Sequence, residues 1–450
     1  MSSARGIGLR SASALVAANM IGAGVFTTSG FALADLGNPI PVLVAWIAGG
    51  VLALCGALSY AGLARQIPGN GGEYLFLSRK LHPLMGFLAG WVSLLAGFTA
   101  PIAVAAHGLE AYARGSFGFE FPDGVLGAGA IVLAGLTHGI ARAPGLRLQD
   151  FAVAIKLLAI VAFILVGAFV LGSAESATTV ANAGGGAATG AVATTWSGVS
   201  ISAFAVTLVW ISFAYAGWNA AVYVAGELEE PERTLPRALV MATLGVTAVY
   251  VSLNAVFLFA APIDELAGKA EVGAIAAEAL AGPAARAALS GVVALGLLTS
   301  ISAMIMVGPR VYAQMADDGV LPRSLGSGVD APHRAIALQV GLSLIAFFMS
   351  DLRELLLYVG FLLGLSAAAT VSCLFLKSMR ENGDRPPTLG FPWIPGLFIG
   401  ATLGSAGFMV YREPVQAAAG FGTLVLGVLV YFVTVRGRGA SGGAAEPADG

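Results

Sequence analysis

Two glycine-containing sequences lie where they could form a binding site inside a membrane. Gly22 and Gly24 interrupt an apolar segment from about 13 to 34, and Gly217 interrupts a second from about 200 to 226. Each glycine weakens a helix by roughly 0.5 to 1 kcal/mol relative to alanine, so both helices are expected to unwind there. Unwound backbone in a bilayer must be buried in protein or line a cavity. The interruptions therefore predict a site, although glycines also occur where helices simply pack closely.

Four polar or broken features are predicted to share one depth. Counting from the nearest charged residue at a helix end, at 1.5 Å per residue, places each roughly 14 to 18 Å inside the span. They are Gly22, Gly217, the intramembrane Lys156 and the hydroxyl pair Thr299 and Ser300. Their common depth is close to the bilayer midplane, where a transporter would bind its substrate.

Half-helix ends offer charges of both signs to a ligand. Free N–H groups around Ala23 to Val25 favour a carboxylate, and carbonyls at the ends of the preceding half-helix and of the segment near Phe213 to Tyr215 favour an ammonium group. A zwitterion fits both. No Asp or Glu lies deep in a span, which favours a neutral side chain. The predicted substrate-binding residues are Ile21, Gly22, Ala23, Gly24, Val25, Phe213, Ala214, Tyr215, Ala216, Gly217, Trp218 and Asn219.

Within this set, the ring of Phe213 is expected to close over the substrate. The alternative for Trp218 is that it only packs the helix bundle.

Lys156 needs partners, because a lysine at the bilayer centre costs about 2.5 to 3.5 kcal/mol on insertion scales. The oxygens at its depth are the carbonyls around Met20 to Gly22 and the hydroxyls of Thr299 and Ser300.

The elements that must position these residues are membrane helices. The chain has 450 residues, of which 57% are hydrophobic and only 11% charged, far from the usual quarter charged residues of a soluble domain. Both cysteines, Cys55 and Cys373, fall in apolar spans, so neither a metal site nor a disulfide framework is expected. The sequence predicts an all-α integral membrane protein with twelve spans. These lie near 13–34, 41–64, 84–112, 124–141, 146–171, 200–226, 236–261, 287–312, 334–350, 354–377, 393–411 and 415–435.

The lysines and arginines between the spans predict the orientation. Seventeen of the 23 lie on one side if the N-terminus is cytoplasmic, so both termini are predicted to be cytoplasmic. Residues 172–197 are expected to form a flexible external loop, and residues 263–282 a short external helix. The tail from 436 to 450 is expected to be disordered.

Four passages resemble the amino acid/polyamine/organocation (APC) transporters with the LeuT-type fold, and within them the L-type amino acid transporter branch. The passages are Ala18–Phe26, Phe213–Asn219 with Glu227 and Pro231–Ala238, Pro68–Tyr74, and Gly308–Tyr312. The resemblance extends over nearly the whole chain. It implies one transport domain over 1–450, with inverted five-helix repeats at 11–171 and 200–377 whose first helices are broken, and two further helices at 391–435.

The resemblance also implies roles and departures. In sodium-coupled members of this fold a cation lies between spans one and eight, and some relatives carry a lysine at this point of span five, so Lys156 is expected to replace the sodium ion. Ala23 stands where many relatives have serine, and Ala216 where L-type relatives often have glycine. No cysteine occurs in 113–123, where mammalian L-type members carry the one that links them to a glycoprotein partner. The chain is therefore expected to work without a disulfide-linked heavy subunit.

The leading prediction is a sodium-independent secondary transporter of neutral amino acids in the plasma or inner membrane, working by alternating access. Proton symport and exchange both remain open. The alternatives are an amino-acid sensor or other membrane binding protein that does not transport, and a transporter of amines or polyamines. Neither a catalytic residue, a cofactor nor a nucleic-acid partner is predicted, since no acid and base pair or metal-ligand group lies at one depth and no long basic run occurs.

Overall fold

The computed structural model describes residues 7–69, 71–114, 121–140, 146–173, 198–317, 321, 323–326, 333–380 and 386–436. These residues form helices, and one isolated parallel β-bridge joins Ile7 to Leu228. The all-α class predicted from the sequence is thus confirmed for the described residues. Most of the predicted external loop at 172–197 and of the predicted tail at 436–450 lies outside them.

Helices of spanning length account for most of the chain. Among the described residues, eight helices are long and apolar enough to cross a membrane, and the bent pair α1 and α2 makes a ninth candidate. Three further apolar helices, in 125–139, 155–171 and 333–349, are shorter. The described helices are α1 (Leu9–Met20), α2 (Gly24–Leu36), α3 (Pro39–Gln66), α4 (Gly72–Lys80), α5 (Pro83–Val92), η1 (Ser93–Thr99), α6 (Ala100–Ala113), α7 (Val125–Ile140), α8 (Leu146–Leu171), α10 (Ile201–Tyr215), η2 (Ala220–Glu227), α11 (Pro231–Ala260), α12 (Ile263–Leu266), α13 (Val272–Asp317), η3 (Arg323–Leu325), α14 (His333–Met349), α15 (Leu352–Ser372), η4 (Cys373–Phe375), α16 (Lys377–Arg380), α17 (Trp393–Arg412), α18 (Pro414–Tyr431) and η5 (Phe432–Arg436).

Each predicted span overlaps one or more of these helices, and the helix ends differ from the predicted ends. The span predicted at 84–112 is a continuous run of α5, the π-helix η1 and α6. The external helix predicted at 263–282 is instead the four-residue α12 followed by the first turns of α13, which carries non-helical backbone at Ala281 and Gly282. Pro283 follows these two residues, and proline is tolerated where a helix begins. The helix α4 was not predicted.

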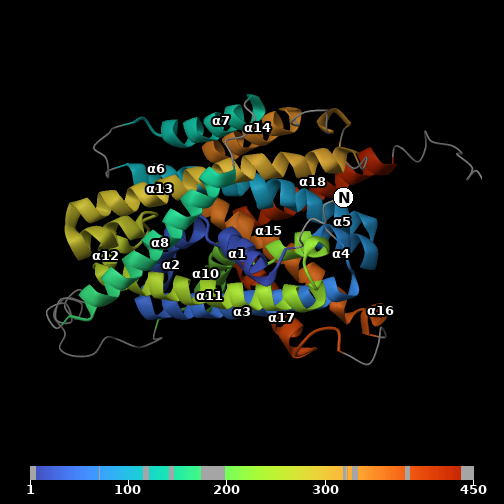
Figure 1. Cartoon of the computed structure of the whole chain (residues 1–450), viewed down its shortest axis with the longest axis horizontal. Coiled ribbons are helices and arrows are strands. Elements are labelled where there is room, and N and C mark those ends of the chain that lie inside the picture. The colour runs from blue at the N-terminus through green and yellow to red at the C-terminus, as the bar shows by residue number, and fades with distance from the viewer. Residues whose placement is uncertain are drawn as a thin grey trace, which may run out of the picture.

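The broken helices lie in the middle of the bundle. In Figure 1, α1, α2 and α10 occupy the centre, with α3 and α11 on one side and α13 and α6 on the other. Close contacts join α1 to α11, and α10 to α2, α3, α15 and α17. The helices α7 and α14 pack together at the edge beyond α13. The two breaks are therefore enclosed by other helices, as backbone that has left a helix requires in a membrane.

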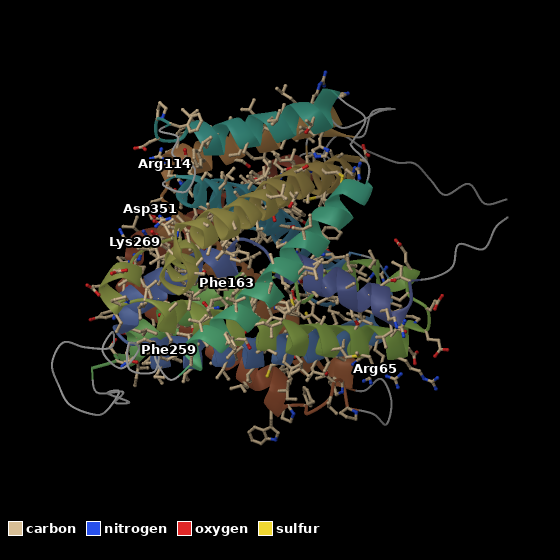
Figure 2. The ribbon with its side chains drawn as sticks, turned by 60° about the vertical axis from the view of Figure 1, so that its left-hand side comes forward. Arg65, Arg114, Phe163, Phe259, Lys269 and Asp351 are labelled. Atoms are coloured by element: carbon tan, nitrogen blue, oxygen red, sulfur yellow. The ribbon has the colours of Figure 1, made fainter. Side chains whose placement is uncertain are left out.

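The bundle has two distinct ends. The helices α4 and α16 lie at one end of the long axis, and α12 lies at the other (Figure 1). We call these the N-terminal end and the α12 end. Figure 2 places Arg114, Lys269 and Asp351 at the α12 end and Arg65 at the N-terminal end. Arg65 thus lies at the opposite end of the bundle from Arg114 and Lys269.

Candidate functional site

The first helix break is the segment Ile21–Ala23 between α1 and α2, whose axes differ by 44°. The N–H of Gly22 donates to the carbonyl of Met20 at 2.8 Å, and that of Phe26 donates to the carbonyl of Ala23 at 3.1 Å. Within the described residues, no hydrogen bond engages the N–H groups of Ala23, Gly24 and Val25. These three groups stand at the N-terminal end of a 13-residue helix, where backbone donors and the helix dipole favour an anion.

The second break follows α10, which ends at Tyr215. Ala216 has an extended ψ of 146°, and Gly217 has φ of 103°, a left-handed region that glycine enters without strain. The chain then continues as the 3-10 helix η2. Both interruptions predicted from the glycines are confirmed as departures from α-helix.

The two breaks touch each other. A Cβ atom on Gly24 would lie 2.6 Å from the Cα of Ala214, and one on Gly217 would lie 2.7 Å from the carbonyl oxygen of Asn19. Both glycines therefore allow the backbones to approach closely and also allow the helices to unwind. The two explanations given for them from the sequence, a helix break and close helix packing, both apply. A bulky residue at Gly24 would therefore push Ala214 away as well as disturb the predicted carboxylate site.

Tyr250 of α11 joins the two breaks and was missed in the sequence. Its hydroxyl lies 2.6 Å from the carbonyl of Met20 and 3.1 Å from that of Ala214, and the single O–H is shared between them. The side chain is fully buried, and its ring packs against Tyr215 with a centroid distance of 5.1 Å. The sequence held one sign of this role, the depth of Tyr250 in the membrane. It lies thirteen residues from Arg237, which is roughly 20 Å along the helix.

Lys156 of α8 reaches the first break. Its Nζ donates to the carbonyl of Ile21 at 2.6 Å, and the side chain is only 5% exposed. A Cβ added at Gly296 of α13 would lie 3.0 Å from the lysine Cδ, so the stem packs on that helix. The hydroxyls of Thr299 and Ser300 donate to the Gly296 carbonyl, each at 2.9 Å. Of the oxygens predicted for Lys156, the structure brings the Ile21 carbonyl to it, while those two hydroxyls bond within their own helix.

The residues after the second break face other helices. Trp218 packs edge-on to Tyr60 and Phe398, with centroid distances of 4.7 and 6.2 Å, which favours the alternative that it packs the bundle. Asn219 donates to Oε1 of Glu73 at 3.3 Å. Phe213 is partly buried beside the core, on the α10 side of the break.

Charged and aromatic side chains join the helices at the α12 end. Arg353 of α15 lies 2.6 Å from Glu413 and 3.6 Å from Asp35 of α2, and its guanidinium sits 5.1 Å from the ring centroid of Trp210. The Trp210 ring meets Phe31 edge-on at 6.1 Å. These contacts connect the outer parts of both broken helices to α15. A cavity of about 350 Å³ lies beside them and is lined by Phe31, His107, Ala111, Gly268, Ala270, Asp351, Leu352 and Arg353.

Comparison with known proteins identifies the family to which this arrangement belongs. A family model described as amino acid permease matches residues 7–435, which include both breaks, Lys156 and Tyr250. The chain belongs to the amino acid permease family. The permease transports amino acids across a membrane and is not an enzyme.

Individual relatives of the permease are similar over nearly its full length. The large neutral amino acids transporter small subunit 2 of Rattus norvegicus is 30% identical over 445 residues, which cover 95% of this chain and 80% of the relative. The serine/threonine exchanger SteT of Bacillus subtilis (strain 168) is 27% identical and is covered to 96%. The cystine/glutamate transporter of Homo sapiens is 27% identical and is covered to 83%. The resemblance inferred from the four sequence passages is thereby confirmed.

Proposed function

We propose that this permease carries neutral amino acids by sodium-independent alternating access, with the substrate held between the two helix breaks. The observation that carries the proposal is the set of unpartnered N–H groups of Ala23, Gly24 and Val25 at the start of α2. They suit the α-carboxylate, and carbonyls at the ends of α1 and α10 suit the ammonium group. Ile21, Gly22 and Phe213 to Gly217 complete the site around the substrate.

The kind of substrate side chain that the site accepts follows from the charged groups near the breaks. Lys156 already donates to the Ile21 carbonyl, and Glu73, the carboxylate that Asn219 contacts, already accepts three hydrogen bonds. Neither group is free to pair with a charged substrate side chain, so neutral side chains are favoured. Two relatives agree with this class by name, since one is a large neutral amino acids transporter small subunit and the other a serine/threonine exchanger.

Lys156 supports independence from sodium. Its ammonium group already supplies a positive charge at the first break, close to α13, where the cation of sodium-coupled members of this fold is expected. A sodium ion at the same carbonyl would be repelled by that charge. The exchanger among the relatives favours exchange as the mode of transport.

The membrane topology is part of the proposal. The three shorter apolar helices in 125–139, 155–171 and 333–349 would join the other nine candidates to give twelve spans, arranged as inverted repeats over 11–171 and 200–377 with two further helices at 391–435. The N-terminal end would face the cytoplasm, as the distribution of lysine and arginine predicts.

The permease is further proposed to act without a disulfide-linked partner. The name of the rat relative describes a small subunit, which implies assembly of that protein with another. In this chain Cys55 and Cys373 are both buried in the bundle, and the segment 113–123 contains no cysteine. A disulfide to an external partner would need a cysteine at the surface.

Counterflow in proteoliposomes of the purified permease tests the function. We expect vesicles loaded with unlabelled alanine or serine to accumulate the labelled amino acid, equally in sodium and in choline buffer. Binding of amino acids without any accumulation would instead indicate a sensor. Accumulation of amines or polyamines in preference to amino acids would contradict the proposed site.

A further inference from the structure

Glu73 is a partly buried acid that the proposed site does not use. It lies in the first turn of α4, directly after Gly71 and Gly72, which have φ of 122° and 54° and turn the chain from α3 into this helix. At Gly72 any side chain would meet the ring of Tyr223, 2.5 Å from its Cε1. The turn thus leads into α4, which lies at the N-terminal end of the bundle (Figure 1), and the Glu73 side chain is only partly exposed.

Three donors from three helical segments converge on this carboxylate. Oε1 accepts from the hydroxyl of Tyr60 in α3 at 2.6 Å and from Nδ2 of Asn219, at the start of η2, at 3.3 Å. Oε2 accepts from the hydroxyl of Ser366 in α15 at 2.6 Å. We call these four residues the Glu73 cluster. It ties the segment that follows the second break to α4 and α15.

The cluster has no cation among the residues that the structure describes. No lysine, arginine or histidine lies within ion-pair distance of Glu73, and the titratable groups facing it are the phenols of Tyr60 on α3 and Tyr223 on η2. The contact from α15 is the hydroxyl of Ser366, and α5 carries no titratable side chain. On α4 itself, Arg79 and Lys80 lie in the last turn, more than one helical turn away.

Both protonation states of Glu73 can be accommodated. The carboxylate accepts from all three donors. When Oε2 takes a proton, the Ser366 hydroxyl can rotate and accept that hydrogen, while Tyr60 and Asn219 still donate to Oε1. Burial raises the pKa of Glu73, and the three hydrogen bonds oppose this rise. The group therefore gains a proton at higher pH than an exposed glutamate does.

Protonation changes the strength of the tie to Asn219. Hydrogen bonds to an ionised acceptor are roughly twice as strong as neutral ones. Charged Glu73 thus holds η2 in place, and neutral Glu73 holds it more weakly. Since η2 follows directly from the break at Gly217, its position affects the proposed substrate site.

We propose that Glu73 is a proton-binding site whose occupancy controls the movement of η2 during transport. A proton from water at the N-terminal end adds to Oε2, the tie to Asn219 weakens, and η2 opens more readily. The inference rests on the proposed transport function and deepens it by naming the ligand, a proton, and the group that binds it.

Counterflow at about pH 5 and about pH 8 on both sides of the vesicle membrane tests the proposal. Because the charged hydrogen bonds are the stronger, we expect wild-type exchange to be roughly fivefold faster at the acidic pH. Glu73→Gln has a side chain of the same length that is neutral at every pH, so this variant should exchange substrate fast at both pH values. The control Glu230→Gln removes an exposed acid that forms an ion pair with exposed Arg233, and it should retain the wild-type pH dependence. A Glu73→Gln variant that responds to pH like the wild type overturns the proposal.

Thermal unfolding separates a failure of this inference from a failure of the transport function. The raised pKa of Glu73 means that its contribution to stability is fully present below the unfolded pKa and is lost as pH rises through the folded pKa. The Tm of the wild type should therefore fall relative to that of Glu73→Gln as pH rises, whether or not the protein transports. A constant difference would contradict the assignment. If Glu73→Gln does not fold, Glu73→Asp serves: its shorter carboxylate should shift the pH midpoint of exchange, and an unchanged midpoint overturns the proposal.

Discussion

Replacing Lys156 by methionine removes the ammonium group and keeps the apolar stem that packs on Gly296. The variant loses the 2.6 Å hydrogen bond from Nζ to the Ile21 carbonyl, which fixes the first break directly before the free N–H groups of Ala23 to Val25. A hydrogen bond to a charged group contributes about 1.5 to 3 kcal/mol. If that energy holds the amides in their binding position, its loss corresponds to about 10- to 150-fold weaker substrate binding.

The assay is equilibrium binding of a labelled neutral amino acid to purified protein, followed by counterflow in sodium and in choline. Lys269→Met is the matched control, because the side chain of Lys269 is exposed at the α12 end (Figure 2) and only its backbone approaches α2, at Gly30. It should bind and transport like the wild type. Wild-type affinity in Lys156→Met, together with normal counterflow, would refute the role of the ammonium group. Strict dependence of the wild type on sodium would refute the reasoning in a different way, since a cation site would then exist beside the lysine.

Three further substitutions test the packing of the breaks. Gly24→Leu should lower the free energy of unfolding by about 1 to 3 kcal/mol, because its Cβ would overlap Ala214 at 2.6 Å. Thermal unfolding measures this, with Gly245→Leu as the control, since the side chain added there meets open space. Equal Tm values for the two variants would contradict the prediction. Tyr250→Phe should lower stability by about 1 to 3 kcal/mol and weaken substrate binding, since two carbonyls lose their shared donor, whereas unchanged binding would limit the hydroxyl to packing. Ala216→Gly should strengthen competition by leucine and phenylalanine in a counterflow assay, and no change would place Ala216 outside the side-chain pocket.

The helix breaks could be predicted from the sequence because their cause is local. Gly22, Gly24 and Gly217 each lower helix stability at their own position, and no distant contact is needed to see this. Lys156 could be predicted to seek oxygen partners for a similar reason, since its cost in a bilayer depends on its own charge. Which oxygen it meets depends on packing, and the Ile21 carbonyl lies 135 residues away in the chain.

The contacts that could not be predicted join residues far apart in sequence. Tyr250 lies 230 residues from Met20, and Glu73 lies 146 residues from Asn219 and 293 from Ser366. The spacing of apolar residues gives no information on such pairs, because the spacing in each helix would be the same with a different neighbouring helix. The helix α4 was also missed: nine residues with two basic groups in the last turn have no apolar pattern of spanning length.

The parallel bridge at the N-terminal end has a mechanical consequence. Ile7 receives a hydrogen bond from the N–H of Glu229 at 3.0 Å and donates one to the carbonyl of Glu227 at 2.9 Å, so the start of α1 is attached to the end of η2. Breaking both would cost about 1 to 3 kcal/mol. The inner halves of the two broken helices should therefore swing as one rigid body rather than as two independent gates. A single spectroscopic distance from either half to α13 would then follow the displacement of both.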